Sequence, residues 1–203
     1  MAHLERSAKD FPMNRRNFVQ VVAAGSVFGT LRAFGQNPAS PGKAAVVRAG
    51  SDRNGLRHYL VRGQVAFDAK VSTADAQGGL FLWENIMTTK GGPPKHRHLE
   101  QDEWFYVLEG EYAAEVGDER FLLHPGDSVY LPRGVPHAWA HVSEGTGRML
   151  GAVQPAGTFE QWVEEVRLLR DQATPAKLRE LLRKHGMEEM GPPLDVTQLK
   201  RSE

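Results

Sequence analysis

Short apolar runs, separated by turn-forming residues, fill the middle of the chain. The runs are short, and apolar residues follow one another within them more closely than helical spacing requires. Short apolar runs of this kind are typical of β-strands. The expected strands lie within residues 44–50, 58–67, 79–88, 103–110, 112–123, 127–132, 137–142 and 148–154. Turn signals such as Gly117-Asp118 and Pro125-Gly126 separate them. No helical pattern falls between the strands, so we expect an all-β sandwich or barrel rather than a parallel α/β fold.

The pattern changes to helical spacing after residue 155. Thr158 followed by Gln161 resembles a capping box, and apolar residues then recur at Phe159, Trp162, Val163, Val166 and Leu169. Thr174-Pro175 is typical of a second helix start, and Gly186 of its end. We therefore expect two C-terminal helices, packed on the barrel or on a partner subunit, with regular structure ending near residues 191–194.

The N-terminal segment has the features of an export signal. Arg15 and Arg16 precede an apolar run from Phe18 to Leu31, which is shorter than the ~20 residues needed to span a bilayer. The pattern resembles a twin-arginine signal, here assigned to residues 1–35 with cleavage before Gln36. Residues 36–57 then form a linker and a first strand. We expect a periplasmic protein without a stable membrane span; an amphipathic helix of a cytosolic protein is the alternative.

Charge and cysteine content narrow the function further. The chain has 25 basic and 25 acidic residues, so no electrostatic attraction for nucleic acid is expected. Cysteine is absent, which excludes disulfides and thiolate metal sites. Any metal must therefore be held by nitrogen and oxygen ligands.

Two histidines and a glutamate lie at the start of an apolar strand. His96 and His98 are two residues apart, so on a strand both side chains point to one face, ~6.6 Å apart. Glu103 joins that face only if the chain bends between Leu99 and Asp102. Glu100 is a rival by its parity with His98, but it lies within the expected bend.

The strand that follows would place Glu103, Phe105 and Val107 on one interior face. A carboxylate in an apolar lining costs several kcal/mol unless a cation compensates it. A later group supplies His137 after a turn at Pro132 and Gly134. His137 shares its strand face with Trp139 and His141.

Together these groups resemble the two motifs of the cupin superfamily. The first motif, G-x5-H-x-H-x(3,4)-E-x6-G, is matched by His96, His98, Glu103 and Gly110; the second, G-x5-P-x-G-x2-H-x3-N, by Gly126, Pro132, Gly134 and His137. Two positions depart from the pattern. Lys90 replaces the leading glycine, and His141 replaces the final asparagine.

The resemblance implies a double-stranded β-helix, or jelly-roll barrel, over residues 58–155, followed by the helical extension at 156–203. It implies one divalent transition metal per chain, held by His96, His98, Glu103 and His137. Iron, manganese, nickel, cobalt, copper and zinc all suit such ligands. Each histidine must be neutral to bind and Glu103 ionised, so metal affinity should fall in acid.

Within the superfamily, the chain most resembles bacterial quercetin 2,3-dioxygenase-like cupins. The resemblance implies that a flavonol binds the metal through its 3-hydroxyl oxygen, that Glu103 takes the proton, and that O2 opens the heterocycle with loss of carbon monoxide. We expect Phe105, Trp139 and His141 to contact this small-molecule substrate. A metal-dependent isomerase, hydrolase or lyase on a small polar molecule and a non-catalytic binding cupin remain open alternatives.

Self-association is the expected partner interaction. Cupins commonly pair through the outer sheet, and Trp104, Tyr106 and Leu108 share the outward face of their strand. A homodimer is therefore expected.

Overall fold

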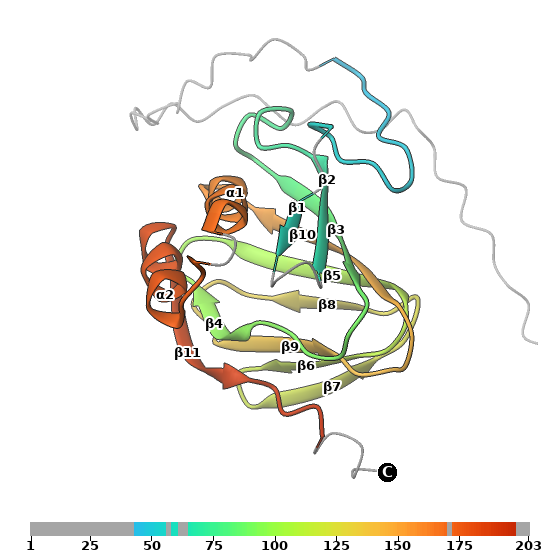
Figure 1. Cartoon of the computed structure of the whole chain (residues 1–203), viewed down its shortest axis with the longest axis vertical. Coiled ribbons are helices and arrows are strands. Elements are labelled where there is room, and N and C mark those ends of the chain that lie inside the picture. The colour runs from blue at the N-terminus through green and yellow to red at the C-terminus, as the bar shows by residue number, and fades with distance from the viewer. Residues whose placement is uncertain (1–42, 56–57, 61–64, 170–171, 198–203) are drawn as a thin grey trace, which may run out of the picture. The chain divides into compact units, whose positions relative to one another are not determined.

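The computed structural model describes residues 43–55, 58–60, 65–169 and 172–197. Within these residues the chain forms two antiparallel sheets that face each other (Figure 1). The first sheet has the order β1 (His58–Leu60), β2 (Val65–Val71), β3 (Phe81–Met87), β10 (Gly147–Gln154), β5 (Asp102–Glu109) and β8 (Ser128–Leu131). The second has the order β11 (Met187–Pro193), β4 (Pro94–His98), β9 (His137–His141), β6 (Tyr112–Val116) and β7 (Glu119–Leu123).

The strand pattern expected from the sequence is largely confirmed. Residues 58–67 contain β1 and the start of β2 rather than one strand, and β4 lies outside the expected strand ranges. Residues 44–50 form no strand; they are mostly exposed and end in a turn, and Val46 is 77% exposed. Apolar residues of both parities follow one another there, so the run has no single face to bury. The predicted export signal at residues 1–35 lies outside the described residues.

Two helices follow the barrel, as the sequence predicts. The first, α1 (Phe159–Leu169), buries Phe159 and Val163, and the second, α2 (Pro175–Lys184), buries Leu182. Thr174 caps α2, since its side chain accepts a hydrogen bond from the Lys177 backbone. Both helices lie on one side of the barrel, with α2 beside β11 (Figure 1).

The C-terminal extension is not purely helical, which corrects the sequence-based expectation. Strand β11 pairs with β4, placing Met187 opposite His98 and Glu189 opposite His96. The register shifts on either side of Gly191. Glycine and proline weaken strand signals, but an edge strand tolerates both. The histidine-bearing strand β4 is thus flanked by β9 on one side and by β11 on the other.

An aromatic cluster joins α1 to the barrel interior. The ring of Trp83 on β3 stacks on Phe67 of β2 and on Phe159 of α1, with ring centroids 4.9 Å apart in both pairs. All three side chains are at most 4% exposed. Aromatic packing of this kind adds to the energy of area burial. It therefore fixes α1 against the inner face of the first sheet.

In the part of the chain that the structure describes, no helix is long and apolar enough to cross a bilayer.

Candidate metal centre

Strand β4 places two histidines on one inward face. His98 is fully buried and His96 is 8% exposed, whereas the residues between and beside them are less buried. After His98 the chain bends through Leu99 and Glu100 before β5 begins. Both bend residues are exposed, so Glu100 lies away from the site and the rival to Glu103 is excluded.

His137 reaches the same point from strand β9. It is paired in register with His96, so the two side chains lie next to each other across the sheet. The preceding turn is closed by a hydrogen bond from the Val135 backbone to the Pro132 carbonyl, and Gly134 adopts a φ of +76°. Gly134 also donates its backbone N–H to the carbonyl of His98 at 2.7 Å. This bond ties the turn before one histidine to the end of the strand that bears the other two.

Glu103 enters from the opposite sheet. It alternates with Phe105 and Val107 on the inner face of β5, and all three are at most 3% exposed. The neighbouring residue, Asp102, faces outward and accepts hydrogen bonds from both the backbone and the guanidinium of Arg133. The salt bridge, 2.6 Å between Arg133 Nη2 and Asp102 Oδ2, fastens the start of β5 to the turn that precedes His137.

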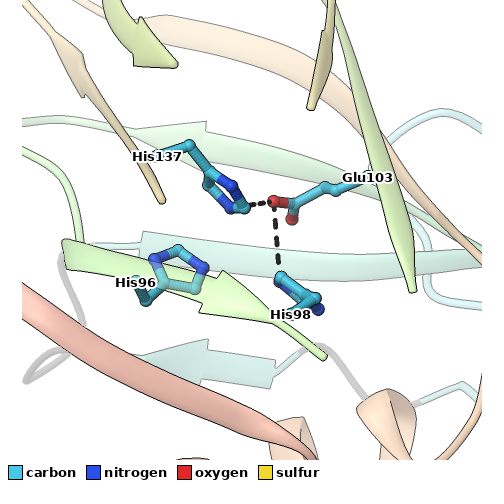
Figure 2. Close-up of side chains that lie close together, drawn as sticks. All are labelled: His96, His98, Glu103 and His137. Carbon is cyan, nitrogen blue, oxygen red and sulfur yellow. Dashed lines mark ion pairs between the residues drawn. The ribbon is translucent and has the colours of Figure 1, made fainter. Parts of the chain in front are cut away.

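The four side chains converge on one point. One ligand atom from each of His96, His98, Glu103 and His137, the His/Glu cluster, lies within 4.8 Å of the other three. Figure 2 shows the Glu103 carboxylate between two of the rings, with Oε2 3.0 Å from Nε2 of His137 and 3.7 Å from Nε2 of His98. These three buried atoms have no conventional hydrogen-bond partner among the described residues.

Each histidine ring is oriented by its other nitrogen. Nδ1 of His96 lies 2.9 Å from the Pro94 carbonyl and Nδ1 of His137 lies 3.0 Å from the Val135 carbonyl. A carbonyl only accepts, so in both rings Nδ1 carries the proton. The lone pair of Nε2 is then free to act as a ligand, which is the arrangement that metal-binding histidines adopt.

Gln101, which the sequence analysis did not single out, fixes the third ring. Its side-chain nitrogen donates to the carbonyls of Pro155 and Ala156, so its oxygen must face Nδ1 of His98, 3.1 Å away. Gln101 is 4% exposed. Its position within the bend between the histidine pair and the glutamate is the only sequence signal that could have drawn attention to it.

The electrostatics of the cluster favour the protonation states that a cation requires. Burial, aided by the charge of His137, lowers the pKa of His96 to about 4. Burial alone would raise the pKa of Glu103, but close contact with His137 and the charges of the other imidazoles outweigh it and hold the pKa below its ordinary value. At neutral pH the cluster therefore offers neutral His96 and ionised Glu103. Three imidazoles and one carboxylate are compatible with a single divalent transition metal ion.

Two residues of the cluster, His96 and Glu103, line a cavity of about 540 Å³. That volume suits a drug-sized organic ligand. The walls come from both sheets, including β11, and from both helices. The lining residues are Val65, Phe67, Trp83, Asn85, Met87, Thr89, Lys90, Gly91, Gly92, Pro93, Pro94, His96, Glu103, Phe105, Trp139, Phe159, Trp162, Val166, Pro175, Leu178, Leu182, Met187, Glu189 and Pro193. Most of these side chains are apolar or aromatic.

The structure divides the predicted substrate contacts. Phe105 and Trp139 line the cavity, and their rings meet edge to face at a centroid distance of 5.5 Å. His141 does not line it. Its Nδ1 lies 3.2 Å from the Thr89 carbonyl and its Nε2 lies 3.0 Å from the hydroxyl of Ser143. Both nitrogens are thus engaged at the far end of β9, which removes His141 from the cavity.

One family model matches part of the barrel. Residues 84–153 match the family model of the cupin domain. The match runs from within β3 almost to the end of β10 and includes all four residues of the His/Glu cluster. The predicted fold class, a mostly β jelly roll with two C-terminal helices, is confirmed by the two antiparallel sheets and by α1 and α2, and the cupin match lies within those sheets.

Individual relatives match shorter segments. Quercetin 2,3-dioxygenase of Bacillus subtilis is 33% identical over 92 residues, covering 43% of this chain and 26% of that enzyme. Oxidoreductase iacF of Pestalotiopsis fici is 38% identical over 61 residues, covering 29% of this chain and 30% of that protein. The solved structure of a predicted oxalate decarboxylase of Thermotoga maritima gives a TM-score of 0.47 at 17% identity, covering 54% of this chain and 98% of that one. The matched segments span 26% to 42% of the length of the curated relatives.

Proposed function

We propose that the chain is a metal-dependent cupin dioxygenase that acts on a flavonol-like or other small phenolic or dicarbonyl substrate. One observation supports this above all: two members of the His/Glu cluster, His96 and Glu103, line a largely apolar cavity of ligand size. Donor atoms and substrate space are thus adjacent.

The donor atoms themselves support a resident cation. The Nε2 atoms of His98 and His137 and Oε2 of Glu103 are buried without conventional partners among the described residues. Burying such groups costs free energy unless something satisfies them. A divalent ion on these atoms and on His96 would remove that cost and supply a Lewis-acid centre at the cavity wall.

Glu103 is the group that would handle a proton. It is the carboxylate of the cluster and a part of the cavity wall, and its lowered pKa keeps it ionised at neutral pH. In this position it would accept the proton of a substrate hydroxyl. The aromatic side chains of Phe105 and Trp139 would hold the ring system of the substrate and exclude water.

The relatives support an oxidative reaction. Two of the proteins matched by sequence are a quercetin dioxygenase and an oxidoreductase. The cavity supports an aromatic rather than a sugar-like substrate, because few polar side chains line it. An isomerase, hydrolase or lyase acting on a small polar molecule would have to place many hydroxyl groups against apolar walls.

The test combines metal analysis with an oxygen electrode. Purified protein should contain close to one transition-metal ion per chain, and it should consume O2 when a flavonol is added, with one carbon monoxide released per O2. Glu103→Gln should abolish this activity, whereas Glu100→Gln, an exposed glutamate three residues away, should leave it unchanged. Turnover without O2 would indicate the isomerase or lyase alternative. Tight binding without product would indicate a binding protein.

We also propose export and self-association. The Arg15-Arg16 pair ahead of an apolar run supports a periplasmic location, which fractionation of cells expressing wild type and Arg16→Lys protein would test. The outward face of β5, where Leu108 is 37% exposed, and Tyr130 on the neighbouring edge strand β8, which is 57% exposed, support a homodimer. Size-exclusion chromatography with light scattering would test the homodimer, and a measured mass equal to that of one chain would refute it.

A further inference from the structure

Asn85 is a polar side chain in the apolar part of the cavity wall. It lies in the middle of β3 on the inner face, is 2% exposed, and lines the cavity. Its side-chain oxygen is buried and has no hydrogen-bond partner among the described residues. Buried amide oxygens in folded proteins are almost always paired, so this one requires an explanation.

The sheet around Asn85 offers the amide oxygen no partner. Its cross-strand neighbours are Phe67 on β2 and Met149 on β10. Along β3, the residues that share its face are Trp83 and Met87. Three of these four side chains have no N–H or O–H group. The fourth, Trp83, has an indole N–H that is itself buried without a partner, so the two groups do not satisfy each other.

A leucine of similar volume would suit these neighbours better than an amide. Replacing a buried unpaired polar group by an apolar one of the same shape is generally neutral or stabilising. A residue that breaks this rule inside a cavity marks a binding position, because its partner arrives with the ligand.

The position of Asn85 relative to Glu103 defines the shape of that ligand. Register places Glu103 opposite Val153, and Val153 opposite Phe81, which lies four residues before Asn85 on β3. Strand geometry then separates the two backbones by roughly 16 Å. Two linked ring systems would fill such a span once the inward-pointing side chains are included.

We propose that Asn85 is a second anchor of the cavity, and that it binds a hydroxyl group at the far end of an aromatic ligand whose other end faces the His/Glu cluster. The inference rests on the proposed function and names the class of substrate more closely. A hydroxyl group both donates and accepts, so it satisfies the amide in either orientation. A charged group is disfavoured, because the four inner-face neighbours of Asn85 carry no charge.

The experiment uses two probes that differ by one hydroxyl group. Binding of 3-hydroxyflavone and of 3,4′-dihydroxyflavone to metal-loaded protein is measured by titration calorimetry without O2. Wild-type protein should bind the dihydroxy compound more tightly. Asn85→Leu should weaken binding of that compound by roughly 10- to 100-fold and leave 3-hydroxyflavone within about threefold, as expected for the loss of one buried hydrogen bond. Met87→Leu, on the same strand, face and cavity wall, should affect both probes equally and slightly.

A second measurement separates binding from structure. Without ligand, Asn85→Leu should melt at the same temperature as wild type or a few degrees higher, because a buried unpaired amide oxygen has been removed. A lower melting temperature would show that Asn85 supports the fold and would overturn the inference, as would equal losses for both probes. If Asn85→Leu does not fold, Asn85→Ala serves for the probe comparison. If wild-type protein binds neither probe, the proposed substrate class is wrong and the inference falls with it.

Discussion

Glu103→Gln should greatly reduce the rise in melting temperature that a bound metal ion gives the protein. The substitution keeps the size of the side chain but replaces the carboxylate, whose Oε2 lies 3.0 Å from Nε2 of His137, by a neutral amide. The three histidines remain oriented by their own hydrogen bonds. The change therefore acts on the charge at the centre of the cluster rather than on its framework.

The magnitude follows from the linkage between binding and folding. An ion present at 100 times its dissociation constant stabilises the folded state by about 2.7 kcal/mol. For a folded unit of this size that is roughly a 5–11 °C rise in melting temperature, at 2–4 °C per kcal/mol. If the amide weakens binding by about 100-fold, an ordinary loss for a damaged metal site, the same metal concentration contributes only about 0.4 kcal/mol. The shift then falls to roughly 1 °C.

The assay is thermal unfolding of chelator-treated protein, with and without a fixed concentration of Mn2+, Ni2+ or Zn2+. Comparing each variant with its own metal-free baseline removes any direct effect of the substitution on stability. Glu100→Gln is the matched control, since Glu100 is exposed in the neighbouring bend, and it should retain the full shift. A full metal-induced shift in Glu103→Gln would refute the assignment of Glu103 as a ligand.

Two further predictions concern protons and packing. In metal-free protein the melting temperature should fall as the pH decreases from about 6.5 towards 4, because the buried His96, with its pKa lowered to about 4, takes up its proton later than the unfolded chain does; His96→Asn should flatten this fall, and a level wild-type profile between these pH values would contradict it. Gly151→Ala on β10 should lower the melting temperature by several degrees, since the added Cβ would lie 2.5 Å from the buried ring of Trp83 and overpacking costs about 1–3 kcal/mol. Gly191→Ala, whose Cβ would meet its nearest neighbour at 3.7 Å, should be neutral in the same scan, and equal melting temperatures for the two variants would show that the indole yields easily.

The geometry around His96 and Glu103 could be predicted because it depends on strand parity. Residues two apart on a strand point to the same face, which applies to His96 and His98. Glu103 lies at an odd offset from both, so the chain must bend after His98 for its side chain to join them. The burial of Glu103 beside Phe105 follows from the same alternation. Such local rules need no knowledge of which strands are neighbours.

Contacts that depend on distant segments could not be predicted. Strand β11 contains glycine and prolines, and it forms because the edge of β4 is available to it. Gln101 acquires its role only when the carbonyls of Pro155 and Ala156 arrive beside it. The sequence around Asn85 is that of an ordinary strand. Its apolar surroundings follow from the pairing of β3 with two other strands, which places Phe67 and Met149 beside it.

The position of His141 outside the cavity lining has a related cause. Strand parity places His141 on the same face of β9 as His137. Parity does not show how far along the strand the cavity extends. Four residues beyond His137, the side chain has passed the cavity and reaches Thr89 and Ser143 instead.

The cavity walls combine residues inside the segment that matches the cupin model with residues outside it. The segment that matches the cupin model ends at residue 153, before α1, α2 and β11, all of which contribute to the walls. The donors that would select an ion thus belong to the shared module, whereas the shape offered to an organic molecule is completed by a tail outside it. Exchanging that tail between related barrels should transplant substrate preference without disturbing the chemistry beneath it.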